Sequence, residues 1–257
     1  MNNESAVPSG RRLVTREFLL PFILVTSLFL LWGLAHSLLD VLNKHFQDIL
    51  GITRARSGLV QAALYGGYFI MAIPAGIFMS RLGYKKGIIT GLLLYAAGAF
   101  LFWPATFIQT FGFTLLCLFI IACGLTFLET AANPYSSVLG PKETSEQRLT
   151  LSQSFNGLGW IIGPALGGSL ILGSGGGTET NKFASMALPY MLIGSVVLVV
   201  AILFIFTRLP EIHEGEHNSH GDKGTFGGLF RIRHFRYSVV AQFLYVAAQT
   251  GINSFFI

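Results

Sequence analysis

The chain has 257 residues, of which 52% are hydrophobic and only 11% are charged, and its mean hydropathy is +0.62. Soluble domains carry about 25% charged residues, so this composition excludes an ordinary soluble protein and predicts an integral membrane protein. The net charge is +5, but the basic residues are spread over short loops, and we therefore expect no nucleic-acid partner. Cys117 and Cys123 point to different sides of one helix, which predicts neither a disulfide nor a metal pair.

In chain order, the sequence contains six complete apolar runs long enough to cross a bilayer and the start of a seventh. The complete runs cover residues 18–42, 58–79, 87–103, 111–137, 149–172 and 187–206, and the seventh begins near residue 237. Breaks are expected at 43–57, at 80–86, around Pro104, at 140–148 and in the Gly-rich stretch 173–177.

These runs predict an all-α integral membrane protein with four parts. We expect an N-terminal tail at 1–17, a six-helix bundle at 18–207, a hydrophilic linker at 208–236 and the start of a further bundle at 237–257. Because all but four of the 17 Lys and Arg residues fall on the side of the N-terminus, that side is predicted to be cytoplasmic. The linker carries His213, His217 and His220, but its Gly-rich sequence favours a hydrated connector over a metal site.

Two carboxylates lie inside or at the inner edge of the apolar runs. Asp40 belongs to the first run and Glu129 to the fourth, and the runs contain no Lys or Arg to pair with them. An ionisable group at membrane depth costs about 2.5 to 3.5 kcal/mol on insertion scales, so such residues usually serve a proton or substrate pathway. We therefore expect both to be functional.

Polar side chains recur at helical spacing on four of the runs. Each set falls on one helix face: Trp32, His36 and Asp40; Gln61, Tyr65 and Tyr68; Thr126, Glu129 and Asn133; Gln153, Asn156 and Trp160. Amides and carboxylates bond sugar hydroxyls and aromatic rings stack on sugar C–H faces, so a shared interior lined this way suits a small polyhydroxylated ligand. Helix packing is the alternative for any one amide or Tyr, and it is the main role expected for Gly159, Gly163 and Gly167.

Several segments resemble the major facilitator superfamily, and within it the fucose and glucose/galactose permease branch of proton-coupled sugar transporters. Gly76, Arg81, Gly83, Lys85 and Lys86 are similar to the superfamily signature G-x-x-x-D-R-x-G-R-R, with Ser80 where Asp is usual. The branch is identified by "GIITGLLLYAAGAFLFWPA" at 87–105, "FLETAANP" at 127–134, "QSFNGLG" at 153–159 and "RIRHFRYSVVAQFLYVAAQT" at 231–250.

The resemblance implies a major facilitator-type fold of twelve helices in two halves, with the substrate site between them, so we expect this chain to be a truncated form. It implies proton coupling through Asp40 and Glu129 and substrate contacts from Trp32, Asp40, Gln153 and Asn156. The signature at Gly76, Arg81, Gly83, Lys85 and Lys86 would act as a cytoplasmic gate. The branch pattern has an Asn-rich run where this chain has His36, Ser37, Leu38 and Leu39. The resemblance therefore does not predict which sugar is transported.

The predicted function is import of a monosaccharide, L-fucose-like or glucose/galactose, coupled to protons. The proton is the coupling ion, with no cofactor or metal, and a monomer in the bacterial inner membrane is expected. Gly163 and Pro164 also resemble a motif of proton antiporters, which keeps an exporter as the alternative. An intramembrane aspartyl protease is disfavoured because neither carboxylate follows a Gly, and a passive channel has no need for carboxylates that change protonation.

Overall fold

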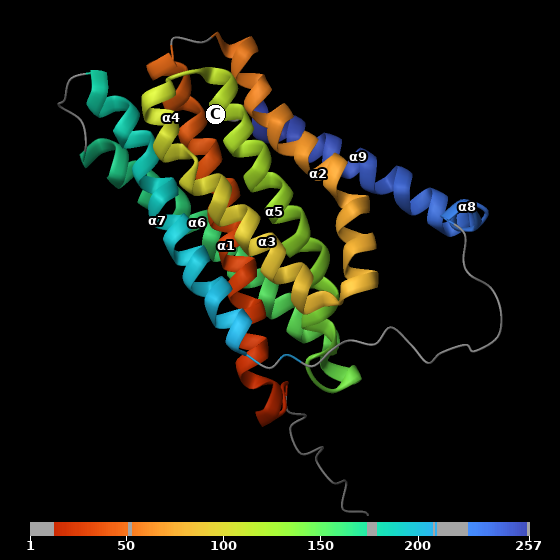
Figure 1. The fold of residues 1–257 in the computed structure, drawn as a ribbon. Helices are drawn as coiled ribbons and strands as arrows, with labels where there is room; N and C mark the ends of the chain where they lie inside the picture. Colours follow the sequence, from red (N-terminus) through yellow and green to blue (C-terminus); the bar gives the residue numbers. More distant parts are fainter. Residues whose placement is uncertain (1–12, 51–52, 174–178, 208, 210–225, 256–257) are drawn as a thin grey trace, which may run out of the picture. The chain divides into compact units, whose positions relative to one another are not determined.

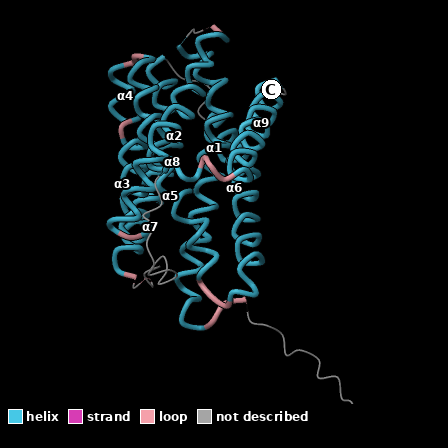
Figure 2. The backbone as a smooth tube through the Cα atoms, turned by 90° about the vertical axis from the view of Figure 1, so that its right-hand side faces the viewer, coloured by secondary structure: helices cyan, strands magenta, loops and turns pink. Residues whose placement is uncertain are grey.

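The structure is a computed structural model that describes residues 13–50, 53–173, 179–207, 209 and 226–255. Side chains are described at 13–39, 53, 56, 58–169, 187–207, 209 and 228–249. The described part consists of helices joined by short loops (Figure 2). It divides into two compact units, Met1–Ile212 and His213–Ile257, and each is treated by itself.

The first unit is a bundle of long helices that run alongside one another (Figure 1). Two short 3₁₀ turns, Arg16–Phe18 and Lys142–Thr144, precede α1 and α6. The helices are α1 (Leu19–Leu50), α2 (Arg54–Leu82), α3 (Tyr84–Phe100), α4 (Phe102–Ile108), α5 (Phe111–Val138), α6 (Ser145–Gly173) and α7 (Glu179–Phe206). The most extensive packing joins α1 to α6, α5 to both α2 and α3, and α3 to α7.

The second unit contains α8 (Phe226–Leu229) and α9 (Arg233–Phe255). The helix α9 covers the region where the seventh run was expected to begin. The proposed boundaries of the tail, bundle, linker and further bundle stay predictions. The linker's three His residues lie outside the described residues, and among the described side chains no group of three His, Cys, Asp or Glu is placed to hold a metal.

Five helical segments in the described part are long and apolar enough to cross a membrane. They are Arg16–Leu39, Gly58–Leu82, Tyr84–Ile108, Phe111–Val138 and Ala187–Phe206. The helix α6 fills the predicted run at 149–172 but is less apolar, because Ser, Gln, Asn and Gly occupy much of its sequence.

Two predicted boundaries differ in detail from the structure. The break expected around Pro104 is a turn at Leu101, between the end of α3 at Phe100 and the start of α4 at Phe102, and Pro104 lies in the first turn of α4. A second break follows at Gln109, which has a left-handed backbone (φ 50°). A first-turn residue needs no N–H for the helix ladder, so proline is tolerated there.

The helix α1 continues into the predicted break at 43–57 and ends at Leu50, because polar residues such as Lys44 and Gln47 continue a helix as readily as apolar ones. The next helix is capped by Thr53, whose hydroxyl accepts from the Arg56 N–H.

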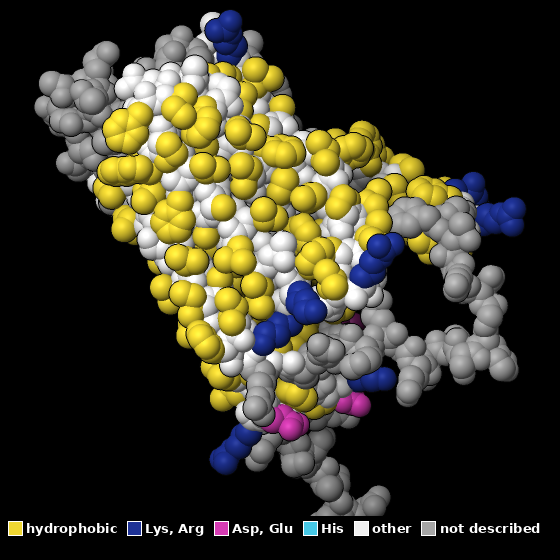
Figure 3. Space-filling view, viewed as in Figure 1, with side chains coloured by type: hydrophobic (Ala, Val, Ile, Leu, Met, Phe, Trp, Pro, Cys, Tyr) yellow, Lys and Arg dark blue, Asp and Glu magenta, His cyan; other side chains and the backbone are white. Residues whose placement is uncertain are grey.

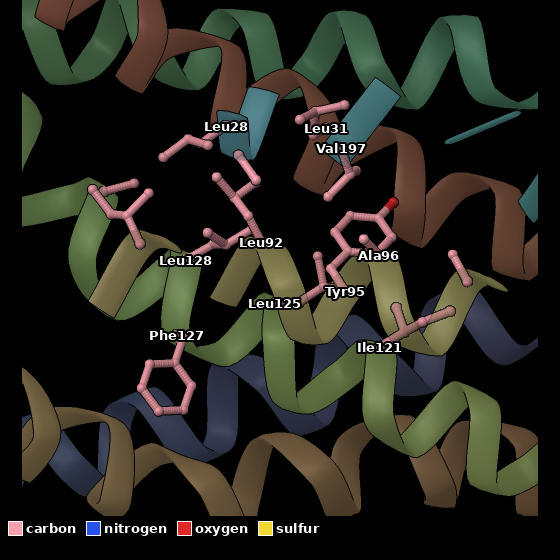
Figure 4. Close-up of a cluster of buried hydrophobic side chains, with 14 of the residues drawn as sticks. Leu28, Leu31, Leu92, Tyr95, Ala96, Ile121, Leu125, Phe127, Leu128 and Val197 are labelled. Atoms are coloured by element: carbon pink, nitrogen blue, oxygen red, sulfur yellow. The ribbon is translucent and has the colours of Figure 1, made fainter. Parts of the chain in front are cut away.

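The core of the bundle lies between α1, α3, α5 and α7. Figure 4 shows part of it, with Leu92, Leu125 and Val197 from three of these helices pointing toward one another. Close approach of α3 and α5 requires Gly124, because a Cβ added there would lie 2.6 Å from the Gly91 carbonyl oxygen.

The outer surface of the bundle is largely apolar. Figure 3 shows one face covered by hydrophobic side chains, with the Lys and Arg side chains toward its ends. Phe69 and Phe107 are 86% and 73% exposed. A soluble protein would rarely expose such rings in a continuous surface, whereas a lipid-facing surface does so without cost.

Candidate functional site

Four aromatic rings from three helices meet on the inner side of α1; we refer to Trp32, His36, Tyr68 and Trp160 as the aromatic cluster. Trp32 and His36 are one turn apart on α1, and their ring centroids are 5.8 Å apart with a T-shaped geometry. The His36 ring lies 5.7 Å from Tyr68 of α2 and 6.1 Å from Trp160 of α6. The sequence placed these rings on three separate helix stripes, and packing brings the stripes together.

A hydrogen bond orients two of these rings. The Trp32 indole Nε1–H donates to the Tyr68 hydroxyl over 2.9 Å and so joins α1 to α2. His36 differs, because its Nδ1 is buried and has no hydrogen-bond partner among the described residues. A buried polar atom without a partner is uncommon and calls for an explanation.

Glu129 lies half-buried on α5 next to the aromatic cluster. It is near enough to Tyr68 to act on it electrostatically. A cavity of about 10 Å³ is lined by both Trp32 and Glu129, a size at the lower limit for one water molecule. No Lys or Arg occurs between residues 87 and 141, so α5 offers Glu129 no cation along its own length.

Amide side chains connect α5 to α6 beside this carboxylate. The Gln153 Nε2–H donates to the Asn133 Oδ1 over 3.2 Å, and the Asn133 Nδ2–H donates to the Glu129 carbonyl over 3.1 Å. Gln153 remains exposed. The amides therefore form a short polar chain that leads from the α6 surface to the backbone of the carboxylate residue.

The predicted substrate residue Asn156 takes part in helix packing as well. Its Nδ2–H donates to the Phe29 carbonyl of α1 over 3.2 Å, and the Ser37 hydroxyl donates to the Gly159 carbonyl over 3.1 Å. A Cβ added at Gly159 would lie 2.6 Å from the Leu30 carbonyl oxygen, so only glycine allows this approach. The packing role predicted for the glycine stripe is thus observed at Gly159.

The other expected site residues are placed as follows. Asp40 lies on α1, but its side chain is outside the described part of the chain. In the predicted gate, Gly83 has a positive φ of 87°, which favours glycine at the turn between α2 and α3. The Lys85 ammonium donates to the carbonyls of Ile205 and Thr207 at the end of α7, over 3.1 and 2.8 Å. Arg81 and Lys86 are exposed, and Gly76 has open space at its Cα.

Sequence reasoning missed the structural role of Arg148, which it counted only as a cytoplasmic charge. The side chain is fully buried (0% exposed) near the start of α6. Its guanidinium donates to the Ser136 and Ser137 carbonyls at the end of α5 and to the Pro141 carbonyl. It also donates to the Thr144 hydroxyl and to the Leu13 carbonyl ahead of α1. No local sequence signal marks such a residue, because its acceptors come from three segments.

Comparison with known proteins gives matches over nearly the whole chain. The profile described as the Major Facilitator Superfamily matches residues 18–257. The L-fucose-proton symporter of Escherichia coli is 44% identical over 263 residues, which cover 95% of this chain and 60% of that protein. A glucose/galactose transporter of Brucella abortus is 36% identical over 234 residues, which cover 91% of this chain and 56% of that protein.

A solved structure gives the same match in three dimensions. The crystal structure of the Escherichia coli fucose:proton symporter has a TM-score of 0.76 and 44% identity, covering 91% of this chain and 61% of that one. The chain therefore spans about 60% of the length of these two fucose symporter matches.

Proposed function

The chain belongs to the Major Facilitator Superfamily, and we propose that the protein is a proton-coupled symporter that imports a monosaccharide by alternating access. The observation that carries this proposal is Glu129, a carboxyl group beside the aromatic cluster in a stretch without cations. The choice of a monosaccharide is supported by the relatives, whose names specify L-fucose, or glucose and galactose.

The geometry suits coupling because the Glu129 carboxyl group lies beside an aromatic ring and borders a cavity of only about 10 Å³. Burying a charged carboxylate in an apolar environment costs free energy, and a proton removes the charge. A protonated Glu129 therefore favours closure of the transporter around substrate, and release of the proton favours reopening. Rocking of the transporter about this fixed site would then expose the proton and the sugar to the other side of the membrane.

In this proposal Trp32 offers a ring face to the sugar, while Gln153 and Asn156 offer amides to its hydroxyls. Asp40 would share in proton coupling and in sugar binding. The gate formed by Gly76, Arg81, Gly83, Lys85 and Lys86 would steady one state of the transporter at the cytoplasmic side. The expected setting is the bacterial inner membrane, with a monomeric protein.

The test is proton movement driven by sugar. The protein expressed from its own complete gene would be reconstituted in vesicles, and external pH would be recorded on adding L-fucose, D-galactose or D-glucose. A symporter alkalinises the medium on addition of its substrate, whereas sugar that drives protons outward would favour the exporter. Sugar uptake without any pH change would favour a passive channel.

Orientation has a separate test, because the cytoplasmic N-terminus rests on charge distribution. Glu143 lies in the turn before α6 and Thr110 in the turn before α5, and both are exposed. Cys at Glu143 should be protected from a membrane-impermeant thiol reagent in intact cells, whereas Cys at Thr110 should react. Labelling in the reverse pattern would invert the topology. The native Cys117 and Cys123 are buried, which keeps the background low.

A further inference from the structure

The His36 ring lies where three helices meet, yet its Nδ1 has no hydrogen-bond partner among the side chains and backbone that the structure describes. Polar groups around it already have partners. The Trp32 indole is bonded to the Tyr68 hydroxyl, and the Ser37 hydroxyl is bonded to the Gly159 carbonyl. Inside a protein an unmade hydrogen bond is costly, so the orphaned nitrogen points to a partner that arrives from outside the chain.

The surroundings of His36 indicate what that partner is. Trp160, on the α6 side of the ring, is 38% exposed. The aromatic cluster is therefore accessible at its α6 edge. An exposed indole beside a hydrogen-bonding imidazole suits a molecule that has both an apolar ring face and hydroxyl groups.

Glu129 borders the same cluster, because it lines the small cavity beside Trp32 and is near enough to Tyr68 to act on it electrostatically. The amides of Gln153 and Asn156 lie on the same face of α6, two turns and one turn before Trp160 respectively.

We propose that His36 determines which monosaccharide is accepted, by exchanging a hydrogen bond between a ring nitrogen and one sugar hydroxyl while the pyranose ring stacks on Trp160. This inference rests on the proposed sugar transport and assigns its selectivity to one side chain. In this proposal the imidazole turns about its Cβ–Cγ bond when the sugar binds, so that a ring nitrogen faces the accessible edge at Trp160. A neutral imidazole can donate or accept there, depending on which nitrogen carries the proton.

The test combines substitution of the protein with removal of single hydroxyls from the sugar. The full-length protein would be titrated with L-fucose, D-galactose and D-glucose, and with analogues of the tightest binder that each lack one hydroxyl. His36→Phe keeps a flat ring but removes both nitrogens. Affinity for the parent sugar should fall about tenfold or more, as expected when a binding site loses one partner of a hydrogen bond.

The decisive result is whether the effect of His36→Phe and the effect of removing one sugar hydroxyl are non-additive. One deoxy analogue should bind the parent protein about tenfold more weakly, and His36→Phe should add no further loss for that analogue alone. If His36→Phe weakens every analogue by the same factor, or weakens none, His36 is structural and the inference is overturned. His36→Leu, which also removes both nitrogens, provides the same comparison if His36→Phe does not fold.

A matched control comes from the bundle core. Tyr95 has a hydroxyl that is also buried without a hydrogen-bond partner among the described residues, but it belongs to the apolar core, beside a small cavity lined by Leu38, Leu125 and Ile193. Tyr95→Phe should leave all sugar affinities unchanged. If the parent protein binds none of the three sugars, the proposed function itself has failed, and that outcome is distinct from a uniform loss in His36→Phe.

Discussion

Removal of the Arg148 guanidinium should destabilise the bundle more than loss of any exposed charge. The guanidinium donates five hydrogen bonds, and the acceptors of four of them are backbone carbonyl oxygens. Two of these carbonyls, Ser136 and Ser137, belong to the last turn of α5, where unsatisfied acceptors and the negative end of the helix dipole favour a cation.

The expected loss of stability depends on two opposing contributions, the hydrogen bonds of the guanidinium and the cost of burying its charge. Hydrogen bonds to charged groups contribute about 1.5 to 3 kcal/mol each, but burial of the guanidinium costs several kcal/mol. Breaking a buried charged network by removing one partner typically costs about 3 to 5 kcal/mol. We expect Arg148→Met to lower the free energy of unfolding by about 3 kcal/mol. Arg148→Lys should give an intermediate loss, because a compact ammonium cannot reach acceptors on both sides.

The measurement is reversible unfolding in mixed detergent micelles, followed by circular dichroism. Lys142→Met is the matched control, since Lys142 is an exposed cation in the 3₁₀ turn just before α6. Its effect should stay within about 0.5 kcal/mol. An Arg148→Met variant as stable as the Lys142→Met variant would refute the assignment of Arg148 as the tie between the α5 end, the α6 start and the segment before α1.

Three further changes test other parts of the bundle. Asn156→Ala should weaken sugar binding by about one to two orders of magnitude and also lower stability by about 1 kcal/mol, because the bond to the Phe29 carbonyl is lost; unchanged binding in a direct assay would remove Asn156 from the site. Gly159→Ala should destabilise by about 1 to 3 kcal/mol through a clash with the α1 backbone, whereas Gly157→Ala, where the added Cβ meets nothing within 4 Å, should not. Arg81→Ala should slow transport while the topology is kept, and a normal rate would leave that residue only an orientation role.

Periodicity within single helices predicted a large part of the site. The stripes that include Trp32, Tyr68 and Trp160 were recognisable because each helix presents one face at a spacing of three to four residues. Their meeting was not readable from any one run, since it depends on how α1, α2 and α6 pack. The small Gly33 and Gly159 allow the close approach of α1 and α6 that brings Trp160 to His36.

Other features depended on contacts far apart in the sequence. The sequence around Arg148 resembles that around an exposed loop cation. Its burial depends on contacts with Leu13 and with the end of α5, which are distant in the sequence. The polarity of Asn156 predicted a ligand contact, but the same amide also satisfies a neighbouring helix, because a carbonyl such as that of Phe29 lies within reach. Helix ends were displaced where polar residues continue a helix past its apolar run, as α1 does up to Leu50.

The most direct test of the central claim is sugar-driven proton uptake by a Glu129→Gln variant of the full-length protein. The amide keeps the size of the side chain but does not take up or release a proton near neutral pH. Proton uptake should be abolished, while exchange of labelled sugar across the vesicle membrane should remain measurable. Glu143→Gln, which changes an exposed acid in the turn before α6, should retain the parent rate. Proton uptake at the parent rate in Glu129→Gln would contradict the account and remove Glu129 as the coupling site.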